Sequence, residues 1–81
     1  MENFSYTDAA ELFVATSFRR NSHIQYQRFD RAADATRYAI ESLLPKLLPG
    51  TVLEVGDARF DSLAIRALYD DAAYPLNRST H

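Results

Sequence analysis

Three carboxylates lie close together in the stretch EVGDARFD, residues 54–61. Glu54, Asp57 and Asp61 could together hold a divalent cation, or act as an acid and a base. They do not follow the spacing of an EF-hand loop, which alternates oxygen ligands along a longer loop and ends on a glutamate. Asp57 follows Gly56 in a pair typical of turns, and Asp61 precedes a helical pattern, where a carboxylate caps backbone N–H groups. The sequence therefore favours a turn and a helix cap over a metal site.

Other signatures of catalysis or cofactor binding are missing from the sequence. There is no cysteine, which removes thiolate nucleophiles and cysteine-bound metals. No serine lies in a G-x-S-x-G elbow, and the two glycines, Gly50 and Gly56, form no phosphate-binding loop. His23 starts a strand pattern and His81 ends the chain, so a site with both would need the tail to fold back. We expect no enzymatic activity, no metal and no cofactor.

The charge of the chain argues against a general nucleic-acid binder. The formal net charge is −2, whereas proteins that bind the phosphate backbone are normally strongly basic. The charge is uneven, however, because residues 19–31 hold four arginines against one aspartate. Arg19, Arg20 and Arg28, with the ring of Tyr26, could form a basic patch with one stacking aromatic. A nucleic-acid-binding module that uses this patch is therefore the alternative function.

Aromatic residues are more numerous than the short predicted helices need for a core. The chain has five phenylalanines and five tyrosines, and tyrosine and arginine are enriched in binding hot spots. A small domain without disulfides often gains stability by associating with itself or with a partner. We therefore predict a non-catalytic domain that acts through protein–protein contacts, as a homodimer or as an accessory or regulatory partner. The predicted interaction residues are Arg19, Arg20, Tyr26, Arg28, Tyr69 and Tyr74.

The N-terminal half is predicted to form a helix and then a strand. Thr7 could cap a helix over about residues 8–20, in which apolar side chains recur at helical spacing and two arginines suit the C-terminal end. In HIQYQRF, residues 23–29, Ile24 and Tyr26 alternate with glutamines, which indicates a strand.

The C-terminal half is predicted to form two helices around a strand. Asp30 should cap a helix over about 31–44, after which the prolines and glycine of PKLLPG form a turn. The β-branched stretch TVLEV predicts a strand at 51–55. Because a two-stranded sheet is marginal alone, we expect either a short third strand at 58–60 or strand pairing across a dimer. Asp61 starts a helix over about 62–71, and residues 72–81 form a partly ordered tail. The expected fold is a single α+β domain, residues 1–81, in the order α-β-α-β-α, with a two- to three-stranded sheet and no internal repeat.

Both C-terminal helices begin after the same dipeptide, Phe29–Asp30 and Phe60–Asp61. Together with GTVLEV and the YPL ending, this pattern resembles a family of small uncharacterised bacterial proteins, a domain of unknown function. The resemblance covers about residues 29–78. It implies the order of elements and no activity, so no functional residue follows from it.

The location of the chain is predicted from its apolar runs. None approaches the roughly 20 residues of a membrane span. The N-terminus is acidic and lacks the basic and apolar regions of a signal peptide. We therefore expect a cytoplasmic protein that does not bind membranes.

Overall fold

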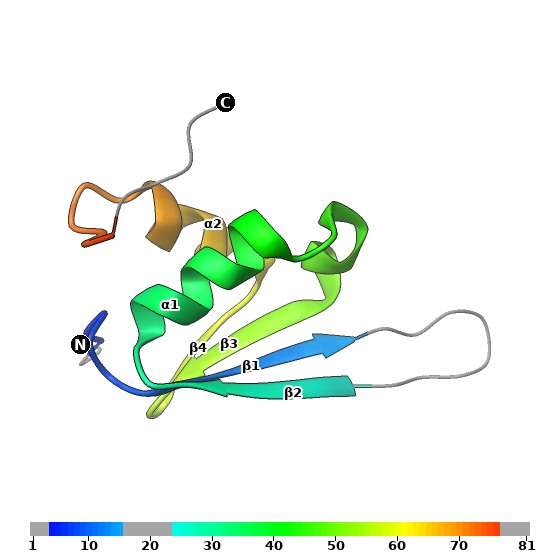
Figure 1. Cartoon of the computed structure of the whole chain (residues 1–81), viewed down its shortest axis with the longest axis horizontal. Helices are drawn as coiled ribbons and strands as arrows, with labels where there is room; N and C mark the ends of the chain where they lie inside the picture. Colours follow the sequence, from blue (N-terminus) through cyan, green and yellow to red (C-terminus); the bar gives the residue numbers. More distant parts are fainter. Residues whose placement is uncertain (1–3, 16–23, 77–81) are drawn as a thin grey trace.

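The computed structural model describes residues 4–15 and 24–76 of the 81-residue chain (Figure 1). Within these ranges the chain forms four strands and two α-helices in the order β-β-α-β-β-α. The strands form one antiparallel sheet in the order β2-β1-β3-β4, and both helices cover the same face of it (Figure 1). The α+β class is confirmed, while the number and order of the elements differ from the prediction. The elements are β1 (Ala10–Ala15), β2 (Ile24–Phe29), α1 (Ala32–Arg37), β3 (Thr51–Val55), β4 (Ala58–Phe60) and α2 (Ser62–Asp70).

The predicted N-terminal helix is wrong, because the described part of that segment is strand β1. Its side chains alternate between the core and the opposite face of the sheet, with Leu12 and Val14 buried and Phe13 half-buried between them. Phe13 and Ala15 are apolar although they lie on the less buried face. The period of two was therefore hidden, and the apolar residues fitted helical spacing equally well.

The strands at 24–29, 51–55 and 58–60 are confirmed, and β1 makes the sheet four-stranded. β1 lies in the centre, where Leu12 pairs with Gln27 of β2 on one side and with Leu53 of β3 on the other. The tight turn between β3 and β4 contains Gly56 with a φ of 58°, a conformation that glycine adopts without steric cost.

The predicted helix at 31–44 is present, but it is not capped by Asp30. Arg31 occupies the N-cap position of α1, and no side chain accepts a hydrogen bond there. The N–H groups of Ala32 and Ala33 instead donate to the carbonyl oxygens of Asp8 and Tyr6, at 2.6 and 2.9 Å. The chain before β1 thus caps α1 with its backbone, which sequence patterns around residue 30 cannot reveal.

After α1 the helix continues as one π-helical segment, Tyr38–Ser42, in which Leu43 N donates to Tyr38 O at 3.0 Å. The stretch Pro45–Gly50, predicted as a turn, forms a short 3-10 helix that leads into β3. Small side chains let α1 and the π-helical segment approach the sheet closely, and Leu12, Leu53 and Ile65 fill the space between the layers. The alanines against the sheet are Ala32, Ala35 and Ala39, each at most 1% exposed.

The two halves of the described chain repeat one ββα unit. The first unit is β1-β2-α1 and the second is β3-β4-α2, and the strand order β2-β1-β3-β4 is symmetric about the β1–β3 pair. A pseudo-two-fold axis therefore passes through the sheet between β1 and β3. The tripeptide Arg-Phe-Asp ends the second strand of each unit, at residues 28–30 and 59–61. The repetition is one of topology, and it is compatible with the lack of an internal repeat in the sequence.

Candidate protein-interaction surface

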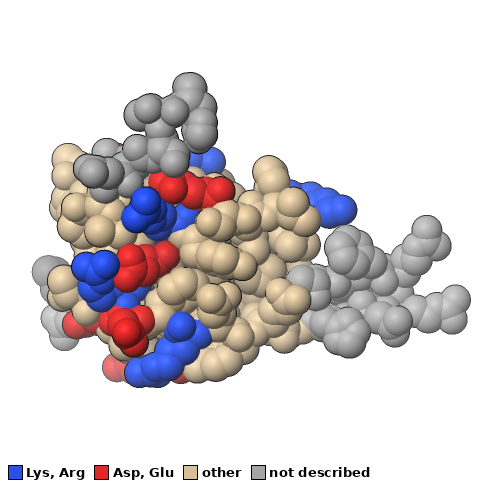
Figure 2. Space-filling model, viewed as in Figure 1, with Lys and Arg blue, Asp and Glu red and all other residues tan. Residues whose placement is uncertain are grey.

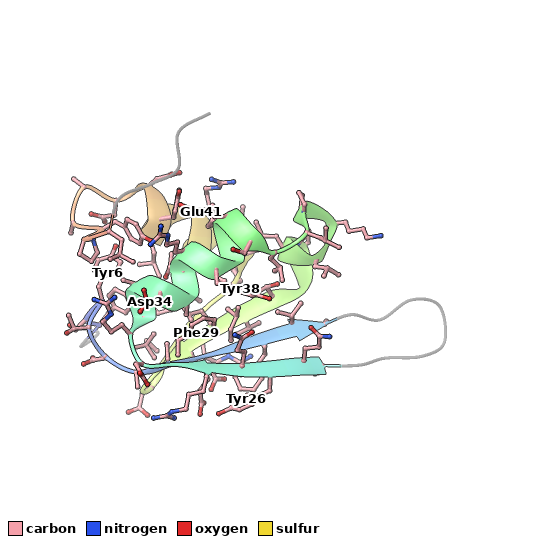
Figure 3. The ribbon with its side chains drawn as sticks, in the orientation of Figure 1. Tyr6, Tyr26, Phe29, Asp34, Tyr38 and Glu41 are labelled. Atoms are coloured by element: carbon pink, nitrogen blue, oxygen red, sulfur yellow. The ribbon has the colours of Figure 1, made fainter. Side chains whose placement is uncertain are left out.

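One face of the sheet is not covered by α1 or α2, and we call it the open sheet face. The alternation of the strands and their register decide which side chains lie on it. Figure 3 shows Tyr26 on this side, whereas Phe29 points toward the helices and Tyr38. The open sheet face consists of Glu11, Phe13 and Ala15 from β1, Ile24, Tyr26 and Arg28 from β2, Val52 and Glu54 from β3, and Arg59 from β4.

Four charged side chains cross the open sheet face in one row. Arg28 pairs in register with Glu11, Glu11 with Glu54, and Glu54 with Arg59. The outer arginines approach the inner carboxylates, with Arg28 Nη1 3.6 Å from Glu11 Oε2 and Arg59 Nη1 3.4 Å from Glu54 Oε2. The row therefore has no net charge, and each carboxylate has a cation beside it.

Next to the charged row lies an apolar patch, which consists of Phe13, Ala15, Ile24, Tyr26 and Val52. Phe13 lies between Tyr26 and Val52 in the register, and the ring centroids of Phe13 and Tyr26 are 5.3 Å apart. Ile24 and Tyr26 are 63% and 55% exposed, high values for large apolar side chains. An apolar patch with a charged border is typical of surfaces that bind other proteins.

Tyr26 connects the patch to the charged row. Its hydroxyl donates to Glu11 Oε2 at 2.8 Å, so the ring is held in place over the strands. The hydrogen bond to Glu11 is the main cause that raises the pKa of Tyr26, and desolvation acts in the same direction. Tyr26 thus remains a neutral phenol at physiological pH.

The carboxylates of EVGDARFD do not converge on one point. Glu54 belongs to β3 and the charged row, Asp57 lies in the β3–β4 turn, and Asp61 caps α2. The cap is confirmed, because Ala64 N donates to Asp61 Oδ1 at 2.9 Å. Among residues 4–15 and 24–76, no group of three or more potential metal ligands occurs.

Two hollows border this side of the sheet, and both are open to solvent. One, of about 300 Å³, is lined by Glu11, Arg28 and Glu54, and the other, of about 340 Å³, by Val52, Arg59 and Asp61. These volumes are at the low end for small-molecule sites. Their polar groups are the ion pairs and the helix cap already described.

Tyr69 and Tyr74, predicted as interaction residues, lie in the core instead, with 5% and 6% exposure. Their rings are 5.2 Å apart, and the hydroxyl of Tyr69 donates to Glu41. The Tyr74 hydroxyl donates to Ala33 O at 3.3 Å. Burial, followed by the charge of Glu41, raises the pKa of Tyr74 to about 12. The chain after α2 is thereby fixed against α1 as far as Leu76, and residues 77–81 lie outside the described ranges.

Basic and acidic side chains alternate over the surface seen in Figure 2 and do not form regions of one sign. The arginines around β2 and α1 are paired, although the sequence there suggested a local excess of positive charge. This arrangement does not favour a strong field directed at a polyanion. The ion pairs are Arg28–Glu11, Arg31–Asp34, Arg37–Glu41 and Arg59–Glu54.

Of the predicted interaction residues, the structure brings Tyr26 and Arg28 together on the open sheet face, and Tyr69 and Tyr74 together in the core. Arg19 and Arg20, like His23, lie outside the described residues. Sequence reasoning missed Glu11, Phe13, Ile24 and Val52 as surface residues. Reading residues 10–15 as a strand would have identified Glu11 and Phe13, since both lie on its less buried side.

Comparisons with known proteins identify no relative. No protein-family model, no curated protein and no solved structure matches the chain. None of the helices in the described ranges is long and apolar enough to cross a bilayer.

Proposed function

We propose that the chain is a non-catalytic domain that acts through protein–protein contacts, with the open sheet face as its binding surface. One observation carries this proposal: the helices cover one face of the sheet, and the other face presents an apolar patch beside a neutral row of ion pairs. Burying an exposed side chain such as Ile24 or Tyr26 contributes roughly 1.5–3 kcal/mol. The lack of cysteine in the sequence suits work in the reducing cytoplasm.

The carboxylates support a non-catalytic role, because each one near the patch has a structural partner. Glu11 and Glu54 lie beside arginines, and Asp61 accepts the N–H of Ala64. These contacts give each of the three carboxylates a role in the fold that requires no acid–base chemistry.

The alternative, a nucleic-acid-binding module, is favoured by one feature of the open sheet face. Phe13 and Tyr26 present neighbouring rings, and bases stack on such rings in single-strand binders. Arg28 and Arg59, however, are opposed by Glu11 and Glu54, so the face offers no net positive charge to the phosphates. We therefore favour a protein partner.

Photocrosslinking tests the proposal in cells that produce the protein. A photoreactive benzoylphenylalanine at Ile24 lies on the patch, and the same group at Leu63, which is 79% exposed on α2, is the matched control. We expect protein adducts from position 24, to a second copy or another protein, and few from position 63. Equal yields at both positions, or none at 24, would contradict the proposal.

A binding assay with single-stranded oligonucleotides distinguishes the alternative. We expect no binding at low salt. Binding that weakens steeply with salt and is lost in Tyr26→Ala would replace the protein partner with a nucleic acid.

A further inference from the structure

The outer edge of β2 is the longer edge of the sheet and lies uncovered by the described chain. Five of its six residues are exposed. Ile24, Tyr26 and Arg28 lie on the open sheet face, and Gln25 and Gln27 lie on the helix side of the sheet. At the other edge, β4 has only three residues. Proteins usually protect an edge strand with lysine, proline or a bulge. β2 contains neither lysine nor proline, and it pairs with β1 residue for residue, without a bulge.

We propose that β2 pairs antiparallel with β2 of a second copy, about a two-fold axis at Gln27, to form one continuous eight-stranded sheet. The inference rests on the proposed function and names a second copy as a partner, bound at the β2 edge of the open sheet face rather than across that face. In this dimer the two open sheet faces join on one side, and the two helix layers lie on the other. Each apolar patch then lies beside the charged row of the other copy, and the two patches lie on opposite sides of the axis.

The register follows from the side chains of β2. Residues directly opposite each other in an antiparallel pair lie on the same face of the sheet, so the axis passes through one residue position. With the axis at Gln27, Arg28 of each copy faces Tyr26 of the other, and Gln25 faces Phe29. The guanidinium then meets an aromatic ring whose hydroxyl is bound to the carboxylate of Glu11, which is a charge-complementary contact.

Neighbouring registers are less favourable. An axis at Tyr26 would place each Arg28 opposite Ile24, a cation against an aliphatic side chain. An axis at Arg28 would place two cations opposite each other, which destabilises a strand pair. β2 has a single charged residue, so the register at Gln27 brings no like charges face to face.

The size of this contact sets its strength. One strand pair and two aromatic contacts bury less than the roughly 1,200–2,000 Å² of a standard interface. We therefore expect a dissociation constant on the order of micromolar rather than nanomolar.

Introduced cysteines report the register, because the chain has none of its own. In Gln27→Cys the two thiols would face each other with Cα atoms about 4.5–5.5 Å apart, within the range of a disulfide. The matched control is Gln25→Cys, in the same strand, on the same face and likewise exposed. Its two thiols would be separated by four positions along the ladder, about 13 Å. We expect mild oxidation to link Gln27→Cys into dimers and to leave Gln25→Cys monomeric. Equal linkage of both, or preferential linkage of Tyr26→Cys, would overturn the proposed register.

Charge reversal at the axis tests the same contact without oxidation. Gln27→Lys and Gln27→Glu each place like charges opposite one another, so each alone should dimerise at least about tenfold more weakly than the wild type. An equimolar mixture should form the heterodimer, as measured by sedimentation equilibrium. Gln25→Lys, which would face Phe29, should dimerise like the wild type. A wild type that stays monomeric at high micromolar concentration would overturn the dimer. So would a mixture of the two Gln27 variants that dimerises no more strongly than either variant alone.

The outcomes separate this inference from the proposed function. Adducts from position 24 to a different protein, with a monomeric wild type, would overturn the dimer and leave the function standing. A monomer with no adducts at position 24 would overturn both.

Discussion

The two aspartates that follow Arg-Phe in this chain allow a matched test of helix capping. Asp61 Oδ1 accepts the N–H of Ala64 at 2.9 Å, whereas Asp30 makes no cap hydrogen bond to α1. The first N–H groups of α1 donate to backbone carbonyls before β1 instead. Replacing each aspartate by alanine therefore makes the same chemical change in two different structural contexts.

We expect Asp61→Ala to lower the free energy of unfolding by about 1 kcal/mol, since N-cap side chains contribute roughly 0.5–2 kcal/mol. The unfolding entropy of small domains, about 2.1 cal/mol/K per residue, amounts to ~170 cal/mol/K for 81 residues. The melting temperature should therefore fall by about 6 °C. Asp30→Ala should stay within about 0.5 kcal/mol, or roughly 3 °C, of the wild type. Asp61→Asn keeps an acceptor oxygen and should recover most of the loss.

Thermal unfolding followed by far-UV circular dichroism measures these differences. Equal losses in the two alanine variants, or a larger loss in Asp30→Ala, would refute the assignment of the caps. The same assay tests the cation alternative for the carboxylates. A rise in the wild-type melting temperature with Ca²⁺ or Mg²⁺ that disappears in Asp61→Ala would show that Asp61 is a ligand.

Three further predictions concern the core, a buried phenol and a turn. Leu53 is fully buried in the central pair of strands. Leu53→Ala should therefore lower the free energy of unfolding in urea by about 2–5 kcal/mol, and a loss below ~1 kcal/mol would contradict its place in the core. Because the pKa of Tyr74 is raised from 10.0 to about 12, the folded state keeps a proton that the unfolded chain releases. Stability should fall by about 1.4 kcal/mol per pH unit across that window, and an unchanged slope in Tyr74→Phe would assign the loss to other groups. Gly56 has a φ of 58°, in the left-handed region. Gly56→Ala should therefore lower the free energy of unfolding by about 1 kcal/mol in thermal unfolding, and Gly56→Asn should lower it less. Equal losses would contradict the need for a left-handed backbone conformation at this position.

Much of the fold could be predicted from the sequence where local signals agree with the tertiary structure. The alternation of glutamines with Ile24 and Tyr26 predicted strand β2, although the expected burial of its apolar side is wrong, because Ile24 and Tyr26 are exposed on the open sheet face. The cap at Asp61 and the turn at Gly56 follow local rules. β1 could not be predicted in the same way, because Phe13 makes both of its faces apolar. Phe13, which made the sequence of β1 compatible with a helix, is part of the proposed binding surface.

The candidate site was only half predictable, because exposure depends on which layer covers a residue. Tyr26 and Tyr74 were both predicted to be interaction residues, yet one is 55% exposed on the open sheet face and the other 6% exposed in the core. The polar neighbours of Tyr26, Gln25 and Gln27, and the apolar neighbours of Tyr74, Ala73 and Pro75, are a weak local sign of this difference. Likewise, Asp30 and Asp61 share their preceding residues, and only the backbone carbonyls of Tyr6 and Asp8 make the difference.

The pseudo-two-fold axis explains why Glu11 pairs in register with Glu54. In two units related by a two-fold axis, a residue next to the axis faces the equivalent residue of the other unit. Glu11 of the first ββα unit therefore faces its equivalent in the second unit, Glu54. The arginine that pairs with each glutamate, Arg28 or Arg59, is repeated by the same operation. The described chain thus has the arrangement of two ββα units that meet at this axis, and the facing positions of Glu11 and Glu54 follow from the symmetry of the two units. Each carboxylate has its own neutralising cation, Arg28 or Arg59, as the same symmetry requires.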